Sequence, residues 1–367
     1  MSVQAGPGAK VLEKLRSMGL SDDFCPVPFF STIFEANGKV CLCRQKGNEF
    51  GVGDIRSQPF EKIWNGEKIR SIRAEFLSGN VRTCRSEIDV DHCNLSPEHL
   101  EYLDLIDLKE VQERMPQRIT PNFNGHCNLR CEMCHVWKFP DKIYDEIGFW
   151  KKLEEEILPV IREIDHFSGE PFVQKDTYRL IRLVSRINPQ IIWSFTTNGN
   201  WRLKGAIQEH LDTIRIRNLI FSIDSLDPIR YARVREKGIL ARALKALEDC
   251  ADYEQVRVSR GLSSLGLSVN MTVQQENLLD VPALVQFCRE RELRLSIRTV
   301  TEPRHLSIER LEKRQLIAAL EYFIECMPPK DLMRTYRITK FILDQVSPID
   351  RARLLVLFQQ GVQGKPI

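Results

Sequence analysis

The sequence has no long apolar run, no apparent signal peptide and no excess of one charge. None of its 367 residues belongs to a run of 18 apolar residues, so we expect no membrane-spanning helix. The first ten residues contain no apolar signal-peptide core, which predicts a cytoplasmic protein. The 53 Lys and Arg residues nearly balance the 50 Asp and Glu residues. The net charge of +3 gives no electrostatic reason to expect a nucleic acid or a membrane as a partner.

Internal repeats and low-complexity tracts are also missing, and the composition excludes wholesale disorder. Hydrophobic residues make up 43% of the chain and charged residues 28%, which is typical of a globular protein. A chain of this length buries about three quarters of its surface and needs no disulfides to be stable. The length predicts two or three domains.

Cysteine is the residue type that stands out. There are 11 cysteines, and eight of them lie within the first 134 residues. Thiols stay reduced in the cytosol, so clustered cysteines indicate metal sites before disulfides. The remaining three, Cys250, Cys288 and Cys326, lie in apolar helical patterns, and we assign them no chemistry.

Short β-branched runs alternate with helical patterns in the middle of the chain. Strands that alternate with helices predict βαβ units and a parallel sheet. Six such units suit a partial (β/α)6 TIM-like barrel, and a doubly wound open sheet is the alternative. In both folds ligands gather at the carboxyl ends of the strands. The expected strands are 118–123, 161–167, 190–196, 218–224, 266–273 and 293–299, and the expected helices are 149–158, 177–187, 239–250 and 280–291.

Three regions are expected along the chain. Residues 1–112 form a small Cys-rich module with a hairpin and a helix, and residues 113–306 form the α/β barrel. Residues 307–367 form a helical tail of two or three amphipathic helices. Packing against the barrel is the simplest role for this tail, and contact with a partner is the alternative.

Three cysteines follow the first expected strand of the barrel. Cys127, Cys131 and Cys134 have the spacing C-x3-C-x2-C. Soft thiolates select zinc, copper(I) or iron–sulfur clusters, and a 4Fe–4S cluster usually takes four cysteines. Three cysteines leave one iron open for a substrate or cosubstrate. A zinc site completed by His126 or His135 is the alternative.

This triplet, in the loop after the first strand of a barrel, resembles the signature of the radical S-adenosylmethionine (SAM) enzymes. The resemblance implies a 4Fe–4S cluster on the three cysteines, with SAM bound at the open iron. The residue before the third cysteine is usually aromatic in that family and packs near the adenine. Met133 stands there and can make the same apolar contact.

Other strand ends agree with the resemblance. Ser168-Gly169-Glu170-Pro171 is similar to the family's Gly-Gly-Glu-Pro motif, which meets the amino group of SAM. Further SAM contacts implied by the resemblance are Asn198, Ser222, Asp224, Arg235 and Asn270. The alternatives are a helix N-cap for Asp224, a solvated helix face for Arg235 and a satisfied core amide for Asn270.

The first hundred residues contain a second cysteine set. Asn37-Gly38 between two apolar runs predicts a hairpin, with Cys25 before it and Cys43 after it. Cys25-x12-Gly38-x4-Cys43 resembles the SPASM and twitch domains, which bind auxiliary iron–sulfur clusters. That resemblance implies Cys25, Cys43, Cys84 and Cys93 as ligands, with Cys41 in reserve. The closing pair is spaced C-x8-C where the family commonly has C-x2-C, and a zinc-stapled hairpin is the alternative.

The resemblance implies an enzyme that cleaves SAM reductively to a 5′-deoxyadenosyl radical, which takes a hydrogen atom from a substrate. The expected outcome is peptide or protein modification, by oxidation or crosslinking. Radical SAM oxidation of a small molecule, such as a sugar or a nucleotide derivative, is one alternative. A non-enzymatic metal-stapled scaffold or redox sensor is the other. A flavodoxin- or ferredoxin-type electron donor is the expected protein partner.

Overall fold

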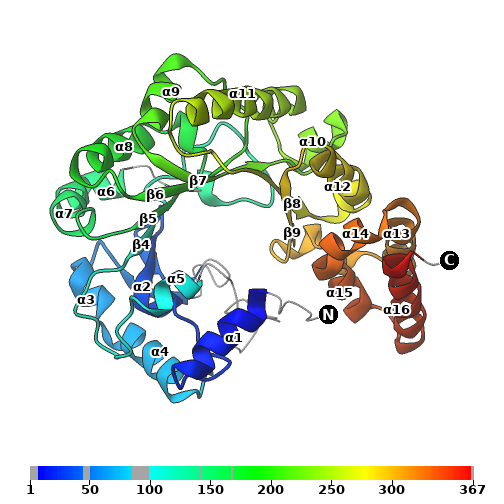
Figure 1. The fold of residues 1–367 in the computed structure, drawn as a ribbon, viewed down its shortest axis with the longest axis horizontal. Coiled ribbons are helices and arrows are strands. Elements are labelled where there is room, and N and C mark those ends of the chain that lie inside the picture. The colour runs from blue at the N-terminus through cyan, green and yellow to red at the C-terminus, as the bar shows by residue number, and fades with distance from the viewer. Residues whose placement is uncertain (1–6, 44–49, 85–98, 140–141, 167, 365–367) are drawn as a thin grey trace. The chain divides into compact units, whose positions relative to one another are not determined.

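The computed structural model describes residues 7–43, 50–84, 99–139, 142–166 and 168–364. These residues are drawn in colour in Figure 1. They form two compact units that interleave along the sequence. The first unit contains residues 1–125, 139–168 and 179–193, and the second contains 126–138, 169–178 and 194–367. Within the described ranges, no helix is long and apolar enough to cross a membrane.

The first unit contains the N-terminal segment and the start of the barrel. Its strands are β1 (Ser31–Phe34), β2 (Lys39–Cys41), β3 (Gly51–Asp54), β4 (Arg118–Pro121) and β5 (Glu163–His166). Its helices are α1 (Pro7–Ser17), α2 (Val27–Phe30), α3 (Phe60–Trp64), α4 (Glu67–Ser78), α5 (Leu100–Leu103), α6 (Ile143–Glu146) and α7 (Phe149–Lys152), which continues as the π-helical turn η5 (Leu153–Ile157).

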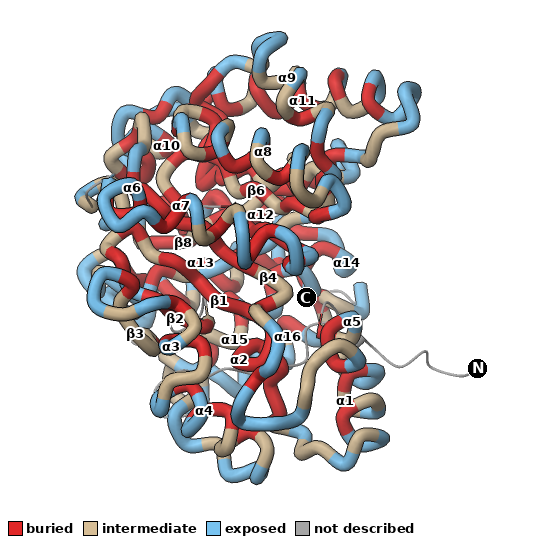
Figure 2. The backbone as a smooth tube through the Cα atoms, turned by 90° about the vertical axis from the view of Figure 1, so that its left-hand side faces the viewer, coloured by how far each residue is buried: buried red, intermediate tan, exposed pale blue. Residues whose placement is uncertain are grey.

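The predicted hairpin is present and is joined to the barrel strands. β1 and β2 pair antiparallel around Asn37-Gly38, and Gly38 has the positive φ of 85° that this turn needs. β1 also pairs in parallel with β4, with Ser31 opposite Arg118. β1 is buried along its whole length (Figure 2). The hairpin therefore extends the sheet to which β4 and β5 belong, in the order β3-β2-β1-β4-β5.

Aromatic side chains form much of the core of the first unit. The ring of Phe34 lies 5.0 Å from Phe60 and 4.9 Å from Phe149, measured between ring centres. Phe123 and Tyr144 continue the cluster at 4.7 Å. Apolar burial of this kind supplies most of the stabilisation of a domain.

The second unit contains the rest of the barrel and the C-terminal helices. Its strands are β6 (Ile192–Thr197), which begins in the first unit, β7 (Arg215–Ser222), β8 (Leu267–Val273) and β9 (Arg294–Thr299). Its helices are α9 (Gly205–Asp212), α10 (Pro228–Val234), α11 (Leu240–Ser259), α12 (Val281–Glu290), α13 (Lys313–Cys326), α14 (Pro329–Leu332), α15 (Tyr336–Gln345) and α16 (Pro348–Gln363). The 3₁₀ turns are η4 (Val136–Lys138), η6 (Pro171–Val173), η7 (Gln275–Asp280), η8 (Arg304–Leu306), η9 (Ile308–Arg310) and η10 (Met333–Thr335), and α8 (Lys175–Ile187) runs through both units.

The predicted α/β fold is confirmed. Each of the six expected barrel strands is present, with ends shifted by up to three residues. β7, β8 and β9 pair in parallel, as β4 and β5 do. The parallel strands and their connecting helices are consistent with a partial TIM-like barrel. The helical tail comprises α13 to α16, which follow β9 (Figure 1).

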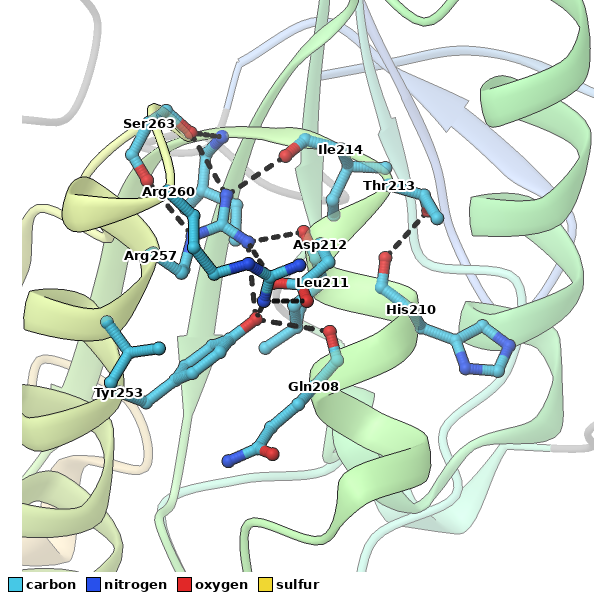
Figure 3. A network of polar contacts seen from close by, with 12 residues as sticks. Gln208, His210, Leu211, Asp212, Thr213, Ile214, Tyr253, Arg257, Arg260 and Ser263 are labelled. Atoms are coloured by element: carbon cyan, nitrogen blue, oxygen red, sulfur yellow. Dashed lines mark hydrogen bonds and ion pairs between the residues drawn. The ribbon is translucent and has the colours of Figure 1, made fainter.

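A buried arginine holds the ends of α9 and α11 together (Figure 3). The Arg257 guanidinium is fully buried and donates to the carbonyl oxygens of Leu211 (2.6 Å) and Ile214 (3.2 Å). It also donates to the Ser263 carbonyl at 3.0 Å and lies 3.4 Å from the Asp212 carboxylate. These bonds satisfy carbonyl oxygens at and just beyond the end of α9 that would otherwise lack donors.

Of the three cysteines without assigned chemistry, two behave as apolar core residues. Cys250 and Cys288 are buried, and burial raises the pKa of each thiol to about 12. Cys326 differs, because it is exposed at the end of α13.

Candidate active site

The cluster loop, residues 126–138, follows β4 and carries the three predicted cysteines. Cys131 is buried, whereas Cys127 and Cys134 are half-buried. The Cys127 sulfur accepts a hydrogen bond from the Leu129 N–H at 3.4 Å. Burial raises the pKa of Cys127 to about 11, and the neighbouring thiols of Cys131 and Cys134 act in the same direction. The three thiols are therefore close enough to interact electrostatically.

The donor set of this loop fits an iron–sulfur cluster. Across the described part of the chain, no three His, Cys, Asp or Glu side chains surround a position for a single metal ion. Three soft thiolates on one loop suit such a cluster. Binding must displace the thiol protons, because thiolates are the ligands.

Gly169 and Glu170 pack directly against the start of the cluster loop. Glu170 donates its N–H to the His126 carbonyl at 3.0 Å. Gly169 has a φ of 61°, and a Cβ there would lie 2.3 Å from the same oxygen, so only glycine permits this approach. Ser168 is buried, and its hydroxyl donates to the Asn124 carbonyl. Pro171 begins η6.

The Glu170 carboxylate connects its own motif to the end of β6. It accepts hydrogen bonds from the Thr197 hydroxyl (2.7 Å), the Asn198 N–H (2.7 Å) and the Phe172 N–H (3.2 Å). Full burial raises the pKa of Glu170 to about 7, although these three donors favour the ionised form.

The Asn198 side chain is hydrogen-bonded to the cluster loop. Its side-chain amide donates to Asn128 Oδ1 at 2.8 Å and to the Cys127 sulfur at 3.6 Å. Its Oδ1 accepts from the Asn200 N–H at 2.7 Å, which fixes the orientation of the amide. Asn128 in turn donates to the Asn200 carbonyl at 2.7 Å. The cluster loop and the end of β6 therefore share one hydrogen-bonded network.

Asp224 and Arg235 form a buried ion pair beside the triplet. Arg235 Nε lies 2.7 Å from Asp224 Oδ2, and the N–H does not point straight at that oxygen. Burial disfavours the charged guanidinium, but the Asp224 carboxylate holds the pKa of Arg235 above its ordinary value. The Arg235 charge also lowers the pKa of Cys131, against the larger raising effect of burial. A positive charge next to the thiols would favour their thiolate form.

Two alternative interpretations of these residues are wrong. Arg235 is buried rather than solvated, and the exposed arginine of this helix is Arg233, paired with Glu276. The N-cap of α10 is Asp227, not Asp224. Asp224 Oδ1 accepts from the Thr272 N–H at 2.7 Å instead.

The remaining predicted SAM contacts lie on β7, on β8 and in the cluster loop. Ser222 ends β7 and lies opposite Asn270 on β8, which lies opposite Ser296 on β9. Residues in register on parallel strands share one face of the sheet. Asn270 is half-buried on that face, and Met133 is half-buried in the loop.

Within the described residues, the predicted cluster cysteines of the first unit lie in separate connections between its helices and strands. Cys25 is buried between α1 and α2, Cys43 is half-buried after β2, and Cys84 is half-buried after α4. Cys93 lies outside the described residues. Cys41 is fully buried in β2, where burial raises the pKa of its thiol to about 12.

Sequence reasoning missed several polar residues of this network. Asn128 lies between two cysteines of the triplet, and Thr197 precedes Asn198. Their positions beside predicted site residues could have identified them as part of the site. Nothing local marked Asn200, which accepts from the Ile239 N–H at 2.7 Å and donates to the Tyr231 hydroxyl at 3.0 Å.

Two family models match the chain. The model of the radical SAM superfamily matches residues 122–288, which include the triplet, Glu170, Asn198 and Asp224. The model of the SPASM iron–sulfur cluster-binding domain matches residues 25–94, which include the N-terminal cysteines. The first domain implies a 4Fe–4S cluster and SAM, and the second implies an auxiliary iron–sulfur cluster.

Curated relatives match part of the chain. The probable GTP 3′,8-cyclase of Methanocaldococcus jannaschii is 26% identical over 188 residues, which cover 50% of this chain and 58% of the relative. The GTP 3′,8-cyclase of Syntrophomonas wolfei is 29% identical over 147 residues, covering 38% and 43%. The chain thus spans about half the length of the curated relatives it matches.

Solved structures are more distant. Streptococcus suis SuiB bound to S-adenosylmethionine is 18% identical, with 83% of this chain and 68% of that chain covered and a TM-score of 0.39. SuiB bound to the precursor peptide SuiA is 17% identical, with coverages of 79% and 67% and a TM-score of 0.42. On the evidence of the two family-model matches, the chain carries a SPASM iron–sulfur cluster-binding domain over residues 25–94 ahead of a radical SAM domain over residues 122–288.

Proposed function

We propose that this chain cleaves SAM reductively and modifies a peptide or protein substrate by oxidation or crosslinking. When bound at Cys127, Cys131 and Cys134, the 4Fe–4S cluster would supply the electron that turns SAM into methionine and a 5′-deoxyadenosyl radical able to take a hydrogen atom from the substrate.

The observation that carries this proposal is the network around Glu170. It joins the cluster loop through the His126 carbonyl and the end of β6 through Thr197 and Asn198. Asn198 then reaches the Cys127 sulfur. Polar residues at separate strand ends are thus fastened to the cysteines, which is the arrangement that a cluster-bound cosubstrate needs.

The chain's own residues would bind and orient SAM at these strand ends. Ser168, Gly169, Glu170 and Pro171 would line the site of the SAM amino group, with Gly169 allowing close approach of the backbone. An ammonium group beside Glu170 would favour its ionised form, against the effect of burial. The Arg235 guanidinium would meet the SAM carboxylate, held in place by Asp224. Ser222 and Asn270 would face the ribose and Met133 the adenine.

The SPASM match supports the second part of the proposal. Cys25, Cys43, Cys84 and Cys93 would hold the auxiliary cluster, which would take up the electron released when the substrate is oxidised. Family members with such domains commonly act on peptides, and this association favours a peptide or protein substrate.

A small-molecule substrate is the second candidate. It is favoured by the curated relatives, because several carry the name GTP 3′,8-cyclase. Their alignments cover about half of this chain, so the name is transferred here only as an alternative.

The decisive experiment is anaerobic incubation of the iron-loaded chain with SAM and dithionite. We expect 5′-deoxyadenosine to form, and Cys131→Ala to reduce it to background. Wild-type protein with a full iron complement and no 5′-deoxyadenosine would reject the proposal. Consumption of GTP together with SAM, when GTP is supplied as a probe, would favour the small-molecule candidate.

A further inference from the structure

The cluster loop carries an aromatic side chain with two cations close to it. Trp137 lies in η4, where none of the three residues is buried. The Arg130 guanidinium lies 5.2 Å from the centre of the indole ring, and the Lys138 ammonium lies 5.1 Å from it. Trp137 Nε1 donates to the Cys131 carbonyl at 3.4 Å. A partly exposed ring with two cations close to it is therefore hydrogen-bonded to a cysteine of the triplet.

Arg130 and Lys138 are held differently. Arg130 Nη1 donates to the carbonyl oxygens of Cys127 (2.6 Å) and Leu129 (2.7 Å), so it also braces the loop. Apart from its contact with the ring, the Lys138 side chain forms no hydrogen bond or ion pair with another described residue. Neither cation forms an ion pair within the described ranges. Aromatic rings and unneutralised cations together are typical of surfaces that bind an anionic partner.

The segments that contact the cluster loop add further positive charge. Asn128 reaches the Asn200 carbonyl, and two exposed cations follow nearby at Arg202 and Lys204. The Arg130 N–H donates to the carbonyl of Glu236, whose exposed carboxylate offsets the charge of the exposed Lys237 beside it, so the added charge comes from Arg202 and Lys204. The whole chain is nearly neutral at +3, so the attraction for an acidic partner would be local.

We propose that Arg130, Trp137 and Lys138 form the surface on which an acidic electron-carrier protein of the flavodoxin or ferredoxin class docks. This inference rests on the proposed function, because it assigns the route by which the triplet cluster is reduced. One electron leaves the carrier and is gained by the cluster, and no bond forms or breaks. Trp137 is bonded to Cys131, so a carrier seated on the ring would lie close to a cluster ligand.

The test measures how fast the triplet cluster of the holoenzyme is reduced, by the initial rate of 5′-deoxyadenosine formation with SAM in excess. Two reductants are compared: reduced flavodoxin, and the small uncharged photoreductant 5-deazariboflavin. Lys138→Glu is the variant of choice, because the Lys138 side chain braces nothing in the loop. We expect reduction by flavodoxin at low salt to slow about tenfold, with a weaker dependence on salt. Reduction by 5-deazariboflavin should stay unchanged.

Lys330→Glu is the matched control, since it makes the same charge reversal at an exposed lysine on α14. The proposal is overturned if Lys138→Glu leaves the flavodoxin rate unchanged, or if Lys330→Glu slows it equally. It is also overturned if both reductants slow together, because Lys138 would then act on the cluster itself. Failure of the proposed function looks different, because wild-type protein would then yield no 5′-deoxyadenosine even with the photoreductant.

Discussion

The two cysteine sets of this chain differ in how far apart their members lie along the sequence. Cys127, Cys131 and Cys134 occupy eight residues of one loop. Cys25, Cys43 and Cys84 lie after α1, β2 and α4 of the first unit. Ligands on one loop can converge through a few backbone turns, whereas distant ligands converge only after the intervening elements have packed. The first set is therefore specified locally and the second by tertiary structure.

The two units also differ in how they bury arginine. Arg257 of the second unit lies next to the Asp212 carboxylate (Figure 3). Arg73 of the first unit is equally buried but bonds only to neutral oxygens, those of Pro28, Asn65 and Glu110. Burial lowers the pKa of Arg73 to about 9. Replacing Arg257, which has a carboxylate partner, and replacing Arg73, which has none, should therefore change the free energy of unfolding by different amounts.

The largest expected effect separates the two cysteine sets. Cys131→Ala should remove about half of the iron and abolish 5′-deoxyadenosine formation, because a 4Fe–4S cluster is lost at the SAM site. Cys25→Ala should remove about half of the iron and leave 5′-deoxyadenosine formation from SAM largely intact. Both are read from iron content and from 5′-deoxyadenosine after incubation with dithionite. Cys326→Ala, at an exposed cysteine, is the control. Unchanged iron in Cys25→Ala would mean that the first unit holds no cluster.

The next largest effect is on stability and concerns Arg257, the buried arginine beside Asp212. Arg257→Met should lower the free energy of unfolding by about 3–5 kcal/mol, because the carbonyls of Leu211, Ile214 and Ser263 lose their donor. Urea unfolding of the second unit measures it. Arg260→Met is the milder comparison, since Arg260 is exposed and bonds only Asp212. If Arg257→Met and Arg260→Met lowered the free energy of unfolding equally, burial of Arg257 would not be the source of its larger expected contribution.

A pH effect of similar size is expected in the first unit. Burial lowers the pKa of His166 to about 4, although its hydrogen bond to the Pro121 carbonyl opposes this. The unfolded chain protonates histidine near pH 6.5, so acid favours the unfolded state as the pH falls from about 6.5 to about 4. Over that range His166 should account for about 3 kcal/mol of lost stability.

His166→Gln should remove this share of the acid sensitivity, as measured by urea unfolding at a series of pH values. His305→Gln changes an exposed histidine and is the matched control. If the His166→Gln protein loses as much stability between pH 6.5 and 4 as the wild type, His166 is not neutral in the folded state.

The smallest expected effect is on stability and concerns Arg73, the buried arginine without a carboxylate partner. Arg73→Met should change the free energy of unfolding by about 1 kcal/mol or less, because it removes a buried charge while leaving two carbonyls without a donor. Thermal or urea unfolding of the first unit measures it. A loss as large as that of Arg257→Met would show that the two buried arginines do not differ in this way.

Much of the fold could be predicted from local pattern. Strand periodicity placed β4 to β9, and Asn37-Gly38 marked the hairpin. The parallel pairing of β1 with β4 could not be predicted, because it joins residues 31–34 to 118–121 across a long crossover. No sequence period encodes which distant strand becomes the neighbour of an edge.

The site shows the same division. Cys127, Cys131 and Cys134 could be found from spacing, and Glu170 and Asn198 from motifs at strand ends. The hydrogen bonds that the Glu170 carboxylate accepts from Thr197, Asn198 and Phe172 could not be predicted from the sequence. They depend on how two strand ends meet in the folded chain.

The sequence by itself determined the resemblance to radical SAM enzymes, the order of strands and helices, and the three cysteines of one loop, since each is written in contiguous residues. Only the tertiary structure decided that Arg235 is buried against Asp224 and that the Arg130 and Lys138 side chains both lie close to the Trp137 ring. It also decided that Arg73 is buried without a carboxylate while Arg257 has one. The physical reason is that charge pairing and burial depend on which segments meet, and that is settled only when the chain packs.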